Sequence, residues 1–155
     1  MLRPLTLKSK LLYRLLNFWP PVLGAGIRIK RMGKSFEFVE VELKRSRWNS
    51  NAVGVQFGGS IYAMADPFYM LMLLHHLGDR YVIWDKAATV RFKKPGRTRL
   101  TAHFTINSEI LAMLVAEVEK GNGRFDWTVR VNILDENETI IAEVDKVIYL
   151  KKKPQ

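Results

Sequence analysis

Residues 59–77 read GSIYAMADPFYMLMLLHHL, and this stretch decides the fold. On a helix its apolar side chains point to nearly every side, as they do in a helix that is buried in a core or spans a membrane. Asp66 and Pro67 at its centre, and the pair His75 and His76 near its end, disfavour a membrane span. Amphipathic segments that need a core follow it, and the sequence therefore predicts a buried central helix.

The segments around that helix alternate apolar and polar side chains, which is typical of half-buried strands. They cover residues 36–45, 82–92, 100–106, 125–133 and 140–150, and a short helix is expected at 109–120. One face of the second segment would carry Val82, Trp84, Lys86, Ala88, Val90 and Phe92. Strands that follow one another through short turns pair antiparallel. We therefore expect an α+β domain in which a curled antiparallel sheet wraps the central helix.

Positive charge is concentrated at the N-terminus. The 155 residues have a formal net charge of +10, and residues 1–34 contain eight Lys and Arg side chains and no acid. We expect a basic helical arm at 1–34, the main domain at 35–150 and a basic tail at 151–155. Apolar residues recur at helical spacing in the arm: Leu11, Leu12, Leu15, Leu16 and Trp19. They predict an amphipathic helix that ends near Pro20 and Pro21 and that either binds an anionic surface or packs on the domain.

Several chemistries are excluded by the sequence. There is no cysteine, so there are no disulfides, thiolate metal sites or thiol nucleophiles. His75 and His76 are adjacent and cannot face one metal ion from a helix, so we expect no metal site. Gly33, Lys34 and Ser35 end like a phosphate-binding loop, but the glycine that such a loop needs five positions earlier is missing.

Three features meet at the start of the central helix. Gly58 and Gly59 would leave backbone N–H groups free at a helix N-terminus, where they can polarise a carbonyl or stabilise an oxyanion. Asp66 follows Gly59 by two helical turns, and we expect it to be buried among apolar side chains, a setting that suits base chemistry. Asn51, in the preceding loop, could orient a water molecule or a carbonyl. The alternative is structural: Asp66 would bond to the backbone at a kink made by Pro67.

The stretch from Asn51 to Asp66, NAVGVQFGGSIYAMAD, resembles the motif of hotdog-fold acyl-CoA thioesterases of the phenylacetate-pathway type. Their motif has an Asn, a short loop, His-Gly-Gly, and an acid seven residues after the second glycine. The resemblance covers about residues 35–150 and implies a curled antiparallel sheet around one long helix. Phe57 stands where that motif has His, so the sequence is closer to an uncharacterised branch with Phe-Gly-Gly and Asp-Pro.

The resemblance implies hydrolysis of an acyl thioester of coenzyme A or of an acyl carrier protein, without a metal or redox cofactor. Asp66 would be the general base or nucleophile, Asn51 would place the water or the thioester, and the Gly59 N–H would polarise the carbonyl. Other residues of the motif would contact the substrate: Gln56, Phe57, Gly58 and Tyr62. The site of that family lies between two subunits, which implies a homodimer, often paired into a tetramer.

A basic turn follows the second strand segment. Lys93, Lys94 and Arg97 would clamp the phosphates of coenzyme A, or would form an ordinary solvated edge. Two other functions stay open: a non-catalytic module that binds or senses acyl thioesters, and a membrane-surface accessory protein that uses the basic arm. A nucleic-acid partner is disfavoured because exposed aromatic side chains do not alternate with the cations. We expect a cytoplasmic protein, and peripheral contact with a membrane through the arm stays open.

Overall fold

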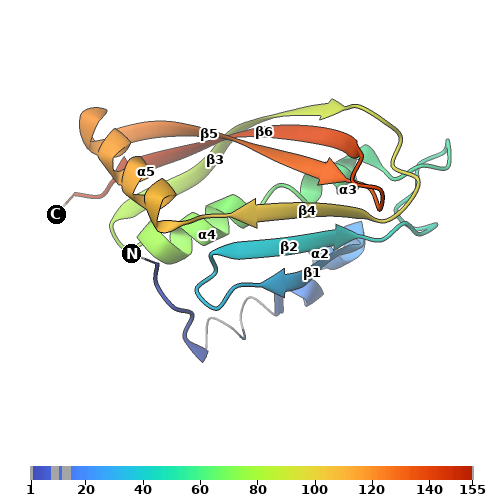
Figure 1. Ribbon diagram of the computed structural model, residues 1–155, viewed down its shortest axis with the longest axis horizontal. Coiled ribbons are helices and arrows are strands. Elements are labelled where there is room, and N and C mark those ends of the chain that lie inside the picture. The colour runs from blue at the N-terminus through green and yellow to red at the C-terminus, as the bar shows by residue number, and fades with distance from the viewer. Residues whose placement is uncertain (1, 8–10, 12–14, 155) are drawn as a thin grey trace.

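The computed structural model describes residues 2–7, 11 and 15–154, and Figure 1 labels its strands and α-helices. Six strands form one sheet: β1 (Ile27–Met32), β2 (Phe38–Leu43), β3 (Tyr81–Phe92), β4 (Leu100–Thr105), β5 (Arg124–Leu134) and β6 (Ile140–Lys152). The helical elements are η1 (Leu16–Phe18), α2 (Pro20–Ala25), α3 (Gly58–Ala63), α4 (Phe68–Leu77) and α5 (Ser108–Lys120). No helix within the described residues is long and apolar enough to cross a membrane.

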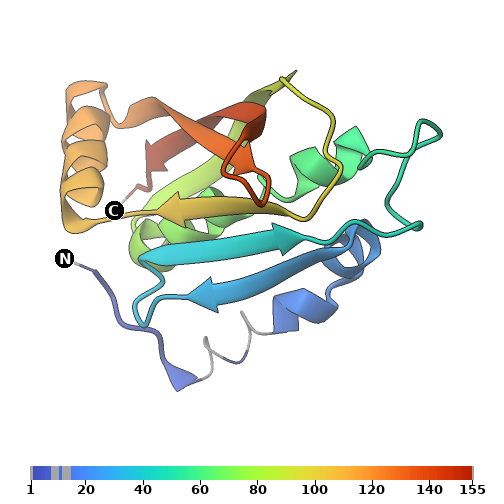
Figure 2. The same cartoon turned by 45° about the vertical axis from the view of Figure 1, so that its right-hand side comes forward.

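The sheet curls around the stretch that contains α3 and α4, as Figure 2 shows. Its strand order is β1-β2-β4-β5-β6-β3, and each neighbouring pair is antiparallel. The edges of the sheet are therefore β1 and β3. This arrangement confirms the expected α+β class and the hotdog architecture, and among the described residues it leaves the long strand β3 with one unpaired side.

The central helix is interrupted beside Asp66 and Pro67. α3 ends at Ala63, and α4 begins one residue after Pro67. Pro67 has no N–H with which to reach the carbonyl of Ala63, and the Asp66 N–H approaches that carbonyl instead, at 3.4 Å. The stretch at 59–77 is central and mostly buried as expected, but the proline divides it into two helices.

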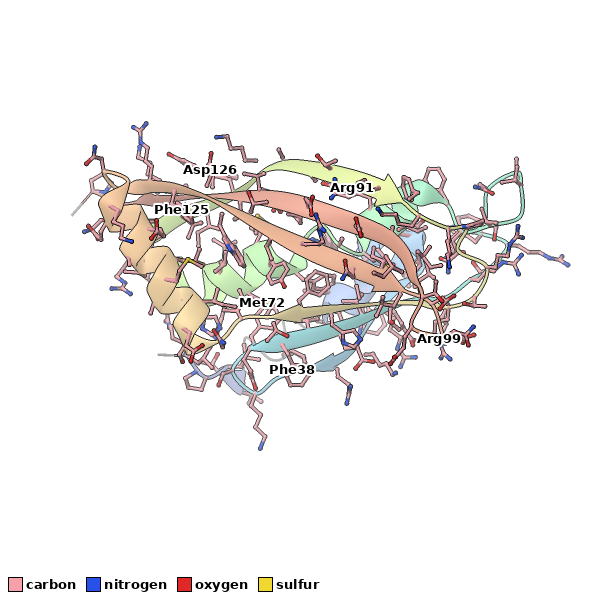
Figure 3. The ribbon with its side chains drawn as sticks, turned by 45° about the horizontal axis from the view of Figure 1, so that its top comes forward. Phe38, Met72, Arg91, Arg99, Phe125 and Asp126 are labelled. Atoms are coloured by element: carbon pink, nitrogen blue, oxygen red, sulfur yellow. The ribbon has the colours of Figure 1, made fainter. Side chains whose placement is uncertain are left out.

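α4 supplies the middle of the core. Phe68 and Met72 are fully buried, and Figure 3 shows Met72 beneath the strands. The ring of Phe104, on β4, lies 5.0 Å from that of Phe68 and 5.2 Å from that of Tyr69, measured between centroids. Such aromatic pairs add about 0.5–1.5 kcal/mol each to the burial of their surface. The sheet therefore encloses α4 through a cluster of aromatic side chains.

The prediction that one face of β3 carries the alternate residues from Val82 to Phe92 is wrong, because the strand contains a bulge. Its pairing with β6 shifts register between Asp85 and Ala87, so Lys86 is an extra residue and the alternation changes phase there. Lys86 reaches Asp126 on the outer face of the sheet, at 2.6 Å, whereas Asp85 points inward to Lys146. The side chains expected on one face are consequently divided between both faces.

Strand β1 lies in the segment that the sequence analysis assigned to the helical arm. Ile27 is buried and Ile29 packs against the core, while Lys30 and Arg31 form ion pairs with Glu40 of β2. Burial alone would raise the pKa of Glu40, but the hydrogen bonds from the two cations outweigh it and hold the pKa below its usual value. Part of the basic charge therefore belongs to the sheet.

The two prolines of the arm begin a helix where the sequence analysis expected one to end. Pro20 and Pro21 form the first turn of α2, where the fixed φ and the missing N–H of proline cost nothing. Of the amphipathic helix expected over residues 11–19, the structure describes only residue 11 and residues 15–19. The remainder of that prediction lies outside the described residues.

Two histidines at the end of α4 hold the N-terminal segment. The backbone N–H of Arg3 donates to His76 Nδ1 at 3.2 Å, and the carbonyl of Arg3 lies 2.8 Å from His75 Nε2. Burial, and then the neighbouring His75, lower the pKa of His76 to about 4. His76 is therefore neutral in the folded protein over most of the pH range.

We expect the free energy of unfolding to fall as the pH is lowered from 6.5 towards 4. In this window His76 takes up a proton in the unfolded chain, where its pKa is near 6.5, but not in the folded protein, where it is about 4. His76 makes its full contribution to stability above pH 6.5. His76→Gln should flatten this part of the profile in urea unfolding, and an unchanged slope would contradict the assignment.

Candidate active site

The break between α3 and α4 holds Asp66 between a lysine and a tyrosine. Lys146, on β6, is completely buried, and its Nζ lies 3.1 Å from Asp66 Oδ1. Lys146 also donates to the backbone carbonyl of Asp66. The hydroxyl of Tyr62 donates to the same Oδ1 at 2.9 Å. These contacts fix the position of the Asp66 carboxylate.

A second carboxylate shares the buried lysine. Asp85 Oδ1 lies 2.9 Å from Lys146 Nζ. Burial raises the pKa of Asp85 and Lys146 opposes that rise, while the nearby Asp66 adds to it. Burial and the hydrogen bond to Asp66 raise the pKa of Tyr62 to about 12, so Tyr62 remains a donor at neutral pH. The described residues contain no group of three His, Asp or Glu side chains that could hold a metal ion.

Asp66 is more exposed than the sequence analysis expected. Its side chain is 45% exposed, although Lys146 beneath it is buried. The apolar helix does not enclose the carboxylate because the chain leaves helical geometry just before Pro67. The carboxylate is therefore held from below and can meet water or a substrate from above.

Aromatic rings cover both glycines at the start of α3. A Cβ at Gly59 would overlap the ring of Phe57, and a Cβ at Gly58 would lie 3.0 Å from the ring of Phe92. Gly59 thus leaves room for the Phe57 ring. The first N–H groups of a helix have no partner within it, so the Gly59 N–H is a donor close to that ring.

Asn51 builds the loop that precedes α3. Its Oδ1 accepts hydrogen bonds from the N–H groups of Val53, at 3.1 Å, and Val55, at 3.2 Å. Gly54 closes the same turn with a φ of +75°, which favours glycine. The amide oxygen of Asn51 is therefore used by the loop, and its Nδ2 group is the part that could reach a substrate.

Two cavities divide the residues that the sequence analysis selected. A cavity of about 390 Å³ brings together five of them: Asn51, Gln56, Gly58, Lys93 and Lys94. A second cavity, of about 430 Å³, is lined by Phe57 and Gly59. Asp66, Tyr62 and Arg97 line neither of the two. Within one chain, the structure does not bring Asp66 and Asn51 into the same cavity.

Gln56 ties two loops together. It is buried, and its Nε2 donates to the carbonyls of Leu43, at 3.2 Å, and Thr98, at 2.6 Å. Its Oε1 is buried without a hydrogen-bond partner among the described residues. Gln56 is thus mainly a structural residue, and its amide oxygen is the atom that could still serve a ligand in the first cavity.

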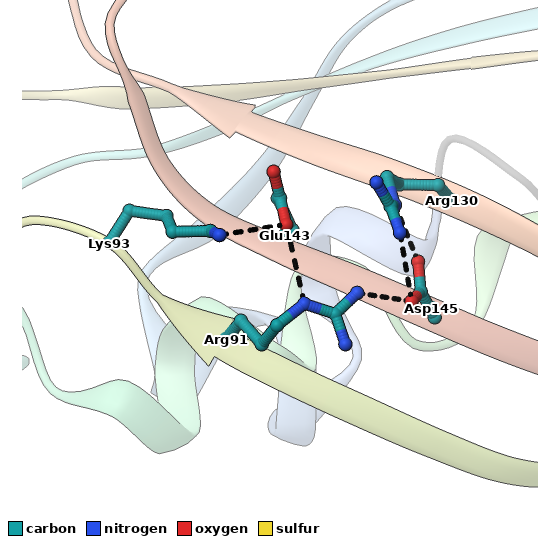
Figure 4. A network of polar contacts seen from close by, with 5 residues as sticks. All are labelled: Arg91, Lys93, Arg130, Glu143 and Asp145. Atoms are coloured by element: carbon teal, nitrogen blue, oxygen red, sulfur yellow. Dashed lines mark hydrogen bonds and ion pairs between the residues drawn. The ribbon is translucent and has the colours of Figure 1, made fainter.

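Lys93 belongs to a network of ion pairs on the outer face of the sheet, shown in Figure 4. Its Nζ lies 3.2 Å from Glu143 Oε2, which Arg91 also approaches, at 3.3 Å. The network is completed by Arg130 and Asp145. Hydrogen bonds from Lys93 and Arg91 hold the pKa of Glu143 below its usual value. Lys93 is therefore already paired, whereas Lys94 is exposed at the first cavity.

The sequence analysis missed Lys146 and Asp85. Lys146 is in phase with Val144 and Ile148 in the alternating last strand, so the period of two alone places this lysine on the inner face. An inward-facing lysine was the signal that could have revealed the cluster. Asp85 had no comparable signal, because the bulge at Lys86 changes the phase of its strand.

Residues 8–150 match the family described as a domain of unknown function, DUF4442, and the chain belongs to that family. No curated protein matches the sequence. Solved structures extend the comparison to proteins that share the fold.

A Pseudomonas aeruginosa protein of unknown function, described as a probable thioesterase, has a TM-score of 0.84 and 19% identity, over 99% of this chain and 100% of that one. A thioesterase from Haemophilus influenzae has a TM-score of 0.68 and 19% identity, over 98% and 96% of the two chains. A Staphylococcus aureus thioesterase has a TM-score of 0.59 and 13% identity, over 84% and 97%. At these identities the likeness establishes the hotdog fold.

Replacing the buried lysine by an apolar residue should destabilise the protein strongly. Lys146→Met leaves Asp66 and Asp85 without their shared cation, and breaking a buried ion pair costs about 3–5 kcal/mol. Adding Asp85→Asn should recover part of that loss. The matched control Lys151→Met, on an exposed lysine of the same strand, should change the free energy of unfolding by less than about 0.5 kcal/mol. Equal effects of the two lysine variants in urea unfolding would contradict this assignment.

Proposed function

We propose that the protein hydrolyses an acyl thioester, of coenzyme A or of an acyl carrier protein, in the cytoplasm. The observation that carries the proposal is the Asp66 carboxylate, which Lys146 and Tyr62 hold in place while 45% of the side chain stays exposed. A general base needs both a fixed position and access to water. The fold that the chain shares with thioesterases supports the same class of reaction.

In the proposed reaction Asp66 takes a proton from a water molecule while the water oxygen attacks the carbonyl carbon of the thioester. The N–H of Gly59 donates to the oxyanion of the tetrahedral intermediate. The carbon–sulfur bond then breaks, and the leaving thiolate takes the proton back from Asp66. The products are the free acid and the thiol, and Asp66 returns to its starting state.

A second copy of the chain would bring Asn51 close to Asp66. The edge strand β3 is 12 residues long, and an unpaired edge of this length is a template for another strand. Trp84 and Phe92 are exposed on β3, and Phe92 also lines the cavity that contains Asn51. We therefore propose antiparallel pairing of β3 with its counterpart in a homodimer, alone or as half of a tetramer.

Two positions replaced in the Staphylococcus aureus thioesterase have the same spacing as Asn51 and Asp66. In that protein the replaced glutamine and glutamate are fifteen residues apart. Asn51 and Asp66 are also fifteen residues apart, and they carry the same amide and carboxylate groups on shorter side chains. The equal spacing favours one arrangement of amide and carboxylate in both proteins.

Lys94 is the member of the basic turn that would meet coenzyme A first. It is exposed and lines the cavity that contains Asn51 and Gly58. Lys93 is held by Glu143, and Arg97 lies outside that cavity. A phosphate group bound here would therefore contact Lys94 before either of the other two cations.

Phe57 favours a second candidate function, a module that binds or senses acyl thioesters without hydrolysing them. Its ring lies against Gly59, the residue whose N–H is proposed to stabilise the oxyanion. A ring at that place can keep a carbonyl away from the donor. The two candidates differ in whether bound thioester is converted to free thiol.

Asp66→Asn should lower the rate of thiol release from an acyl-CoA thioester by roughly 10²–10⁴-fold, the usual effect of removing a positioned acid–base group. Asn51→Ala should have a smaller effect, because water can replace part of a positioning group. The control Asp79→Asn changes an exposed acid that pairs with Arg3, and it should leave the rate unchanged. Full activity in Asp66→Asn would make this acid purely structural, and binding without thiol release by the wild type would favour the sensing module.

Light scattering should give at least twice the chain mass of 18.0 kDa. Ala87→Asp, on the exposed part of β3, should weaken the association, because symmetric pairing would bring two added carboxylates together. Asn132→Asp adds the same charge to an exposed position of the inner strand β5 and should not change the mass. A wild type that runs as a monomer at micromolar concentration would rule out a shared site.

A further inference from the structure

Exposed apolar side chains gather at one end of the molecule, on the loop between β2 and α3. Trp48 is 85% exposed and Val53 is 77% exposed. Leu23 of the neighbouring α2 is 60% exposed. Figure 2 shows this loop extending past the ends of the strands, on the right of the view. We refer to residues 44–57 together with Leu23 as the loop end. Large apolar side chains that are this exposed and lie on one part of a surface mark a site of contact with a partner.

Hydrogen bonds hold the loop end in its outward conformation. Trp48 Nε1 donates to the carbonyl of Gly24 in α2 at 3.2 Å. The guanidinium of Arg45 donates to the carbonyl of Gly54 at 2.8 Å. Asn49 is buried in the same loop, and its amide both donates and accepts hydrogen bonds there. The indole ring is therefore presented to the outside by a fixed loop.

The charged side chains within residues 44–57 are all positive. Residues 44–57 contain Lys44, Arg45 and Arg47 and no acid, and residues 15–25 contain no charged side chain. Tryptophan at the level of the headgroups and cations at the phosphates are the features that bind a protein surface to an anionic bilayer. A nucleic acid would also attract the cations, but it offers no apolar layer for Val53 and Leu23.

We propose that the loop end docks on an anionic phospholipid bilayer, with Trp48 and Val53 among the headgroups and Lys44 and Arg47 at the lipid phosphates. Apart from Leu23, this surface lies outside the basic arm at 1–34, and its binding does not depend on the proposed hydrolysis. Trp48 lines the same cavity as Phe57 and Gly59. Docking therefore brings the start of α3 to the bilayer, where thioesters with long acyl chains concentrate.

Vesicles of phosphatidylcholine, with and without phosphatidylglycerol, test the proposal on the full chain. The protein should sediment with the vesicles that contain phosphatidylglycerol, and added salt should weaken binding. Lipids with brominated chains should quench the tryptophan fluorescence of the wild type. Trp48→Phe should remove most of that quenching, whereas Trp84→Phe, a change to an exposed ring on β3, should leave it in place.

Charge reversal supplies an independent measurement. Lys44→Glu combined with Arg47→Glu should weaken vesicle binding by at least about tenfold, since each basic residue near the surface contributes roughly a fivefold factor. The matched pair Arg124→Glu and Lys151→Glu changes two exposed cations that face each other on β5 and β6, and it should have little effect.

Three results would overturn the proposal. The first is that the wild type ignores phosphatidylglycerol vesicles at low salt. The second is that quenching survives in Trp48→Phe but is lost in Trp19→Phe, which would assign the bilayer contact to the arm. The third is that the Lys44 and Arg47 reversals change the mass in light scattering and not vesicle binding, which would make the loop end an interface between copies of the chain.

Discussion

A fully buried lysine beneath a broken helix is the constraint on which the rest of the structure depends. Lys146 enters the inner face of the sheet, where an ammonium group must be paired with opposite charge. Asp66 and Asp85 supply that charge. Each carboxylate lies at a local irregularity: Asp66 at the helix break beside Pro67, and Asp85 next to the bulge at Lys86. These two departures from regular secondary structure thus place both carboxylates within ion-pair distance of Lys146.

Asp66 can be both a structural acid at the proline break and a general base. Its contacts with Lys146 and Tyr62 explain why the protein keeps an acid beside a proline in an apolar stretch. The same contacts leave the carboxylate half-exposed and fixed, which are the properties a base needs. Asn51, by contrast, lines a cavity that Asp66 does not line, and the homodimer proposed above would bring the two residues together from different copies. The proposed site therefore depends on association through the edge strand β3.

Periodicity in the sequence was sufficient for the central apolar stretch and for the strands β2 to β6 around it. It failed where the deciding partner is distant: Lys146 is 80 residues from Asp66, and the cations of β1 are paired by Glu40 of the next strand. It also failed at Lys86, because a bulge changes the phase of a strand without a characteristic residue. The expected burial of Asp66 was wrong because the helix around it is not continuous.

Release of free thiol from a panel of acyl-CoA thioesters, from short to long chains and including aromatic acyl groups, tests the central claim most directly. The account predicts that the wild type releases thiol from at least one class of acyl group, at a rate that saturates with substrate. Saturable binding of coenzyme A thioesters without thiol release from any of them would contradict hydrolysis.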